Sequence, residues 1–128
     1  MDIRNLDRVN MPTEYGVQVQ RLLPWDKLNA PFEAGWCVVK PGTATDPHSH
    51  HEYEIFVAVS GTATIEADGE SSPFVAGDVA YMQPGSRHTI INASDRDFEF
   101  YSVWWDQDMS DRFRARHTAA QATGDTGA

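Results

Sequence analysis

Short segments of strand length, separated by turn residues, constrain the fold of this chain more than any other feature. Between residues 15 and 105 these segments are rich in Val, Ile, Phe, Tyr and Trp, the residues typical of strands. The Asp-Gly pair in "ADGE" predicts a hairpin, and the Pro-Gly pairs in "KPGT" and "QPGS" predict turns. Many short strands at close spacing indicate an all-β sandwich or barrel. The predicted strands are 15–23, 35–40, 53–61, 62–68, 73–77, 78–83, 88–92 and 98–105.

The chain length of 128 residues suits a single domain with a substantial core. We expect an N-terminal arm at 1–14, the β-barrel at 15–105, and a short helix with a disordered tail at 106–128. The alternation of apolar residues stops after Trp105, where "DQDMSDRFRARHTAAQ" could form a helix capped by Asp106 or Ser110. The final "ATGDTGA" is expected to be disordered.

Charge and composition narrow the classes of partner. Acidic residues outnumber basic residues by 19 to 10, which disfavours nucleic acid because phosphate binding needs clustered Lys and Arg. No apolar stretch approaches the roughly 18 residues of a membrane span, and the polar start does not resemble a secretory signal. A cytoplasmic location without membrane partners is therefore expected. The single cysteine, Cys37 in "GWCVV", is expected to be a packed thiol.

The stretch "HSHHEYE" (48–54) concentrates three histidines and two glutamates in seven positions. In an extended chain His48 and His50 share a face, because side chains alternate along a strand. A turn over 51–53 would then bring Glu54 back beside both imidazoles. We therefore expect His48, His50 and Glu54 to converge on one point.

Two segments resemble the two motifs of the cupin family. The first, "GTATDPHSHHEYEIFVAVSG" (42–61), matches every spaced position of motif one, namely Gly42, His48, His50, Glu54 and Gly61. The second, residues 77–92, matches motif two at Gly77, Pro84, Gly85, His88 and Asn92. Gln83 stands where the family usually has proline. The resemblance covers roughly residues 15–105 and implies a double-stranded β-helix, or jelly-roll barrel.

The resemblance also implies a metal site with His48, His50, Glu54 and His88 as ligands. Three imidazoles and one carboxylate suit a divalent transition metal, with Zn or Fe(II) the leading choices and Mn, Ni or Cu as alternatives. Mg and Ca prefer oxygen ligands and do not fit this set. A six-coordinate metal would keep two positions open for water, oxygen or substrate, whereas zinc would be four- or five-coordinate.

Polar side chains near the motifs are candidates for an acid, a base or a substrate anchor. They are Tyr53, Tyr81, Gln83, Arg87 and Tyr101. Alternation does not fix which face of strands 78–83 and 98–105 turns inward, so no single one stands out. The side chains that could line a pocket or simply fill the core are Trp36, Val38, Phe56, Met82, Ile90, Phe100 and Trp104. The polar residues expected to be exposed or to flank the site are His51, Glu52 and His117.

The resemblance is specific for fold and metal but leaves the reaction open. We expect a metal-dependent enzyme that acts on a small polar metabolite, for example one derived from an amino acid. A weaker similarity, to small cupins that partner methionyl-tRNA-synthetase-like enzymes, favours a redox-neutral Lewis-acid rearrangement such as N–N bond formation in specialised metabolism, with a separate synthetase-like partner. An Fe(II)-dependent dioxygenase and a non-catalytic small-molecule-binding cupin are the alternatives.

The segment "FEFYSVWW" (98–105) is apolar on both faces of its predicted strand. One face would cover the barrel interior, and a lone barrel would leave the other face in water. We therefore expect a homodimer.

Overall fold

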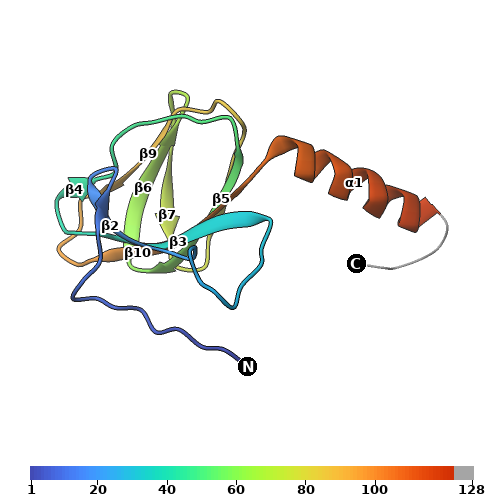
Figure 1. Cartoon of the computed structure of the whole chain (residues 1–128). Coiled ribbons are helices and arrows are strands. Elements are labelled where there is room, and N and C mark those ends of the chain that lie inside the picture. The colour runs from blue at the N-terminus through green and yellow to red at the C-terminus, as the bar shows by residue number, and fades with distance from the viewer. Residues whose placement is uncertain (123–128) are drawn as a thin grey trace.

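The computed structural model describes residues 1–122, which form two antiparallel sheets and a C-terminal helix, α1 (Gln107–Ala122) (Figure 1). The larger sheet contains, in spatial order, β1 (Thr13–Glu14), β2 (Val17–Arg21), β3 (Phe32–Val39), β10 (Phe98–Trp105), β5 (Tyr53–Ser60) and β8 (Val79–Met82). The smaller sheet contains β4 (Thr43–Ala44), β9 (His88–Asn92), β6 (Thr62–Ala67) and β7 (Glu70–Val75).

The two sheets face each other and enclose the core, which is the arrangement of a jelly-roll barrel (Figure 1). The all-β prediction with a short C-terminal helix is therefore confirmed. Side chains from both sheets meet in one cluster of buried residues: Val17, Val19, Cys37, Val39, Phe56, Ala58, Ile65, Phe74, Met82, Ile90, Phe98 and Phe100.

The predicted hairpin at the Asp-Gly pair is confirmed. β6 and β7 pair directly up to Ala67 and Glu70, so the turn consists of Asp68 and Gly69. Both turn residues have positive φ, 50° and 84°. This conformation is the reason that Asp-Gly and Asn-Gly dominate two-residue hairpins.

Alternation along β10 decides what faces the interior. Phe98, Phe100 and Ser102 are buried, while Glu99 and Tyr101 between them are half-buried on the outer face of the sheet. β10 lies between β3 and β5, with eight register pairs to β3. It is therefore a central strand, and its inner side chains reach the middle of the barrel.

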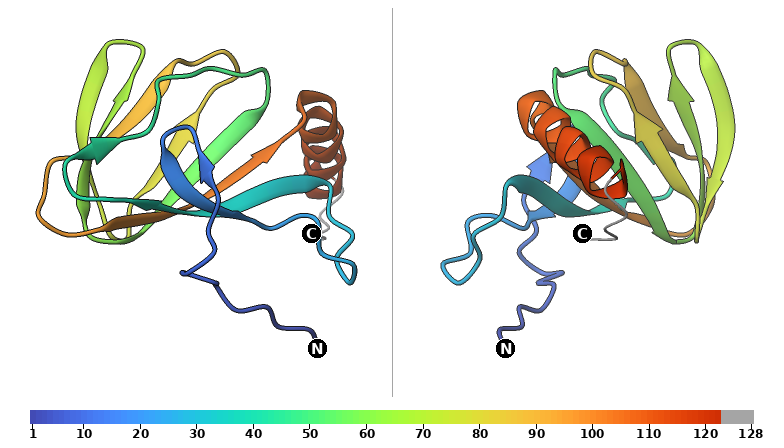
Figure 2. Two further views of the ribbon diagram at one scale, coloured as in Figure 1. Left: turned by 60° about the vertical axis from the view of Figure 1, so that its left-hand side comes forward. Right: turned by 90° about the vertical axis from the view of Figure 1, so that its right-hand side faces the viewer.

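Two short strands of the sheets were not predicted as separate elements. β1 and β4 are two-residue strands that lack the alternation needed to predict them. α1 begins directly after Asp106 and lies to one side of the barrel (Figure 2). Its length and apolarity are insufficient to span a membrane, and the same holds for any helix within residues 1–122. We expected the last residues of the chain to be disordered. From residue 123 onward, this segment lies outside the residues that the structure describes.

Candidate metal centre

Main-chain hydrogen bonds place the histidines of the two motifs opposite each other. The His88 amide donates to the His48 carbonyl at 3.0 Å, and the His48 amide donates to the His88 carbonyl at 3.2 Å. The Pro-Gly turn is fixed to the same loop, because the Gly85 amide donates to the His50 carbonyl at 2.7 Å. Gly85 has a φ of 80°, a left-handed conformation that glycine adopts at no steric cost.

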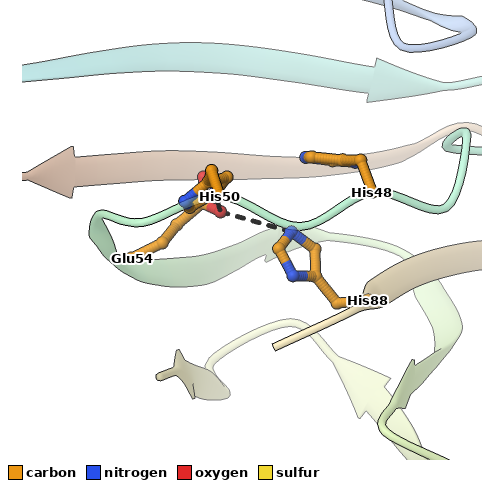
Figure 3. Close-up of side chains that lie close together, drawn as sticks. All are labelled: His48, His50, Glu54 and His88. Carbon is orange, nitrogen blue, oxygen red and sulfur yellow. Dashed lines mark hydrogen bonds and ion pairs between the residues drawn. The ribbon is translucent and has the colours of Figure 1, made fainter. Parts of the chain in front are cut away.

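These constraints bring His48, His50, Glu54 and His88 together (Figure 3). One donor atom from each residue lies within 4.8 Å of the others. His48 and His50 come from the loop before β5, Glu54 from the start of β5, and His88 from the start of β9 (Figure 3). The cluster therefore joins the two sheets at one end of the barrel, and it is the convergence that the sequence predicted.

The protonation of two imidazoles is set by main-chain carbonyls. Nδ1 of His48 lies 2.8 Å from the Asp46 carbonyl oxygen, and Nδ1 of His88 lies 3.0 Å from the Ser86 carbonyl oxygen. A carbonyl oxygen only accepts, so each Nδ1 carries the proton and each Nε2 keeps its lone pair. This arrangement fixes the tautomer and the ring orientation that a metal-binding histidine requires.

Glu54 is buried at the centre of the cluster and is oriented by its neighbours. The Ser102 hydroxyl donates to Oε2, and Nε2 of His50 lies 2.8 Å from Oε1. Burial alone would raise the pKa of Glu54, but the contacts with His88, Ser102 and His50 outweigh burial and lower it. The side chain is therefore a carboxylate at neutral pH, with Ser102 holding one oxygen and leaving the other turned toward the imidazoles.

The residues present fit a bound cation. Nε2 of His88 is buried without a hydrogen bond among the described residues, and it lies 3.3 Å from Oε1 of Glu54. In the neutral ring with its proton on Nδ1, this contact sets a lone pair against a carboxylate oxygen, and it becomes favourable when a second proton or a metal cation lies between the two atoms. Nδ1 of His50 is also buried without a partner, 3.6 Å from Oε1 of Glu52. A divalent transition metal held by three imidazoles and one carboxylate would satisfy Nε2 of His88 and would be held by His50 through the Nε2 that faces Glu54.

His48 has a further contact from the N-terminal hairpin. The ring of Tyr15 stacks on its imidazole, with centroids 4.2 Å apart and an angle of 14° between the rings. The Asp46 amide donates to the Tyr15 carbonyl at 2.8 Å and so holds the hairpin against the loop. Burial lowers the pKa of His48, which favours the neutral imidazole.

A cavity of about 270 Å³ opens onto the cluster. Its walls are mainly aliphatic and aromatic, and its polar groups gather at the cluster and on the N-terminal hairpin. The lining residues are Glu14, Tyr15, Val17, Val19, Arg21, Cys37, Thr45, His48, His50, Glu52, Glu54, Phe56, His88, Ile90, Phe100, Ser102 and Trp104.

The family model described as "Cupin domain" matches residues 35–104, which is more than half of the chain. The chain belongs to the cupin family. The match includes both histidine-bearing segments and all four residues of the cluster.

Two solved structures resemble this chain over most of its length. The solved structure of a cupin 2 conserved barrel domain protein from Salinispora arenicola is 52% identical, with a TM-score of 0.81 over 91% of this chain and 98% of that chain. The plu4264 protein from Photorhabdus luminescens is 41% identical, with the same TM-score and coverage. The curated oxalate-binding protein from Thermotoga maritima is 34% identical over 64 residues, which span 49% of this chain and only about half, 53%, of that protein.

The polar residues that the sequence offered as candidates for catalysis lie outside the cavity of this cupin. None of the four, Tyr53, Tyr81, Gln83 and Arg87, lines the cavity. β8 turns Met82 inward, so Tyr81 points outward and stacks on Tyr53. Gln83 and Arg87 are exposed on the turn before β9. Tyr101 lies on the outer face of the sheet, edge-on to Trp36, where burial raises its pKa.

The remaining sequence candidates divide between wall, core and surface. Phe56, Ile90, Phe100 and Trp104 line the cavity, whereas Trp36, Val38 and Met82 do not. Of the flanking residues, His51 is 76% exposed, while Glu52 turns back and lines the cavity. His117 is half-buried on α1, with its ring stacked on Phe113.

The sequence interpretation missed five polar residues that line the cavity: Glu14, Tyr15, Arg21, Thr45 and Ser102. A signal for Ser102 was present, because it is the lone hydroxyl in register with Phe98 and Phe100 on one face of a hydrophobic strand. The first three lie on β1, β2 and the turn between them, and a sequence pattern does not reveal that this hairpin reaches the cluster.

Proposed function

We propose that this cupin is a metal-dependent enzyme that acts on a small polar metabolite. His48, His50, Glu54 and His88 would hold one divalent transition metal at the floor of the cavity. The observation that carries this proposal is the buried Nε2 of His88, which has no hydrogen bond among the described residues and lies 3.3 Å from Oε1 of Glu54. Such groups are costly to bury without a partner, and they are the donors that a transition metal takes.

The chemistry supplied at this site depends on the ion. Bound zinc would supply Lewis acidity and bound iron(II) redox chemistry, so the metal decides between a redox-neutral rearrangement, of which N–N bond formation is one example, and a dioxygenase reaction. A cavity of about 270 Å³ suits a metabolite of a few carbon atoms rather than a polymer. The expected separate synthetase-like partner stays a prediction.

The chain's own residues orient the site and exclude water. Ser102 holds one oxygen of Glu54, and the carbonyls of Asp46 and Ser86 hold the protons of their histidines at Nδ1. Phe100 and Trp104 add apolar surface beside the cluster, which strengthens polar interactions inside the cavity. Glu52, at the edge of the cavity, is the carboxylate placed to accept a proton from a bound molecule.

The experiment that tests this proposal compares metal-loaded and chelated protein. We expect purified protein to contain about one equivalent of a transition metal, and chelation to abolish turnover while the circular dichroism spectrum is preserved. Assays with and without oxygen would then separate the dioxygenase from the redox-neutral route. Turnover that persists in fully chelated protein would refute the proposal.

A non-catalytic binding role is the second candidate, and one comparison favours it. The Thermotoga maritima relative is named as an oxalate-binding protein, and it is 34% identical to this chain over 64 residues. A small carboxylate is accordingly the first ligand class to test. Metal-dependent binding without turnover in any assay would favour this reading over the enzyme.

We also propose that the chain forms a homodimer through the outer face of the larger sheet. Val59, Val79 and Tyr81 are exposed there at 41%, 63% and 53%. Val79 and Tyr81 pair in register with Val57 and Ile55 of β5, so the apolar surface is continuous across strands. Light scattering should give about twice the 14.3 kDa chain mass, and a clean monomer at micromolar concentration would count against the dimer.

A further inference from the structure

The N-terminal hairpin forms one wall of the cavity, and it contributes one cation. Arg21, the last residue of β2, is the single Lys or Arg among the described residues that line the cavity. Its side chain is 42% exposed and therefore open to a ligand. The sequence motifs and the metal proposal leave this residue without a role.

Arg21 is held in place by three neighbours. Nε and Nη2 donate to the Glu14 carboxylate at 2.7 to 3.1 Å, and the guanidinium carbon lies 5.3 Å from the centre of the Trp104 ring. Oε2 of Glu33 is 3.7 Å from Nη1, beyond hydrogen-bonding distance. A planar cation fixed by a carboxylate on one edge and an aromatic ring on one face has a defined orientation.

The guanidinium keeps free donors on its other edge. It carries five N–H groups, of which Nε–H and one on Nη2 donate to Glu14. Both N–H groups of Nη1 and the second of Nη2 have no hydrogen bond among the described residues. The Nη1 and Nη2 pair is the fork that binds a carboxylate through two parallel hydrogen bonds.

Arg21 and the metal cluster line the same cavity and are linked by one row of residues in the larger sheet. Arg21 is in register with Gly35, and Gly35 with Ser102, so the three form one row across β2, β3 and β10. Gly35 adds no side chain of its own to this row, and Val19 packs against it. A Cβ at Gly35 would lie 3.0 Å from Cγ1 of Val19, which is tighter than ordinary contact. Two strand spacings separate the ends of this row, about 10 Å.

We propose that Arg21 is the second recognition point of the cavity and binds the far carboxylate of a small substrate whose other end reaches the metal centre. The substrate class is an acid of a few carbon atoms with a carboxylate at one end and a metal-binding oxygen or nitrogen group at the other. This inference rests on the proposed function, because it takes the metal as the first recognition point. We expect oxalate, whose two carboxylates are directly bonded, to be too short to reach both recognition points.

The test measures the binding of linear dicarboxylates to zinc-loaded protein by titration calorimetry. The probes are oxalate, malonate, succinate and glutarate, together with succinamate, the half-amide of succinate. Affinity should rise from oxalate to a longer diacid, and succinate should bind about tenfold more tightly than succinamate, as one added charge-assisted hydrogen-bond pair predicts. Arg21→Gln should remove this preference, whereas Arg96→Gln, which alters an exposed residue outside the cavity, should retain it.

Melting curves and zinc content establish that Arg21→Gln is folded and loaded. If it fails to fold, Arg21→Lys replaces it, because lysine keeps the charge but lacks the planar fork. A diacid preference that is undiminished in the Arg21 variant, or absent from the wild type, overturns the proposal.

Chelated protein separates this inference from the proposed function. An Arg21-dependent preference for diacids that survives chelation would leave the role of Arg21 intact and refute the metal as recognition point. Zinc binding and metal-dependent turnover without any Arg21-dependent preference would refute the inference and leave the proposed function standing.

Discussion

The two halves of the barrel interior are built from the same strands but do different work. In one half, Phe98 is fully buried beside Phe74 and Val39, and the space is filled by side chains. In the other half, Ser102 and Trp104 of the same strand border a cavity with imidazoles and carboxylates. Side chains near one end of β10 therefore stabilise the fold by packing. The polar groups of the candidate site, which are costly to bury, lie near its other end.

This separation predicts that the largest loss of stability comes from the closed half. Phe98→Ala should lower the free energy of unfolding by about 3–5 kcal/mol, because it leaves a cavity where no neighbour can collapse. Val75→Ala is the control, since Val75 is 38% exposed on β7 of the smaller sheet, outside the proposed dimer face, and should cost less than about 1 kcal/mol. Urea unfolding of the two variants measures both values, and equal losses would contradict the division.

Removing a metal-binding side chain from the half that contains the cavity should weaken metal binding more than it lowers the free energy of unfolding. His50→Ala and Glu54→Ala should weaken metal binding by more than about 100-fold, beyond the range seen for residues that only support a ligand. His51→Ala should not, because His51 is 76% exposed and turns away. Metal content after dialysis against a competing chelator provides the measurement. Similar losses in all three variants would refute the choice of donors.

A smaller effect is expected at the boundary between the halves. Ser102→Ala should reduce metal affinity by about 10- to 100-fold, because the hydroxyl orients Glu54 without being a donor to the metal itself. Ser60→Ala, at the exposed end of β5, is the control and should leave affinity unchanged. Wild-type affinity in Ser102→Ala would show that packing alone positions Glu54.

The smallest expected effect is a shift in the pH at which metal is lost. Protons compete with the metal for imidazole lone pairs, and free histidine titrates near pH 6.5. Burial lowers the pKa of His48, so its lone pair stays available to a lower pH than in free histidine. Metal content should therefore remain high at pH 6.5 and fall only below it. A midpoint above pH 6.5, or no fall down to pH 5, would contradict histidine ligation in this environment.

The same lowered pKa affects the stability of metal-free protein in a definite direction. Unfolded His48 takes up a proton near pH 6.5, whereas the folded protein binds that proton only at lower pH. The unfolded state therefore gains protons first, and stability should decline as the pH falls below about 6.5. Thermal melts of chelated protein across this range would measure the decline.

Sequence reasoning succeeded where the signal was local. Asp68 and Gly69 specify their hairpin through backbone conformation alone, and the spacing of His48, His50 and Glu54 follows from strand alternation and one bend. It failed where register decides, because alternation does not fix which face of a strand turns inward. Tyr81 and Arg21 illustrate the point: the first was a candidate but points outward, and the second lies on a hairpin whose approach to the cluster depends on pairing across β2, β3 and β10.

The reciprocal backbone bridge between His48 and His88 also bears on how this barrel can diversify. The separation of the two positions is set by main-chain hydrogen bonds, which do not depend on the identity of either side chain. A cysteine or an aspartate at one position would present a softer or a harder donor from the same backbone position, on a shorter side chain. A single substitution at one of these positions can therefore change which metal is preferred, while the backbone hydrogen bonds around the site stay the same.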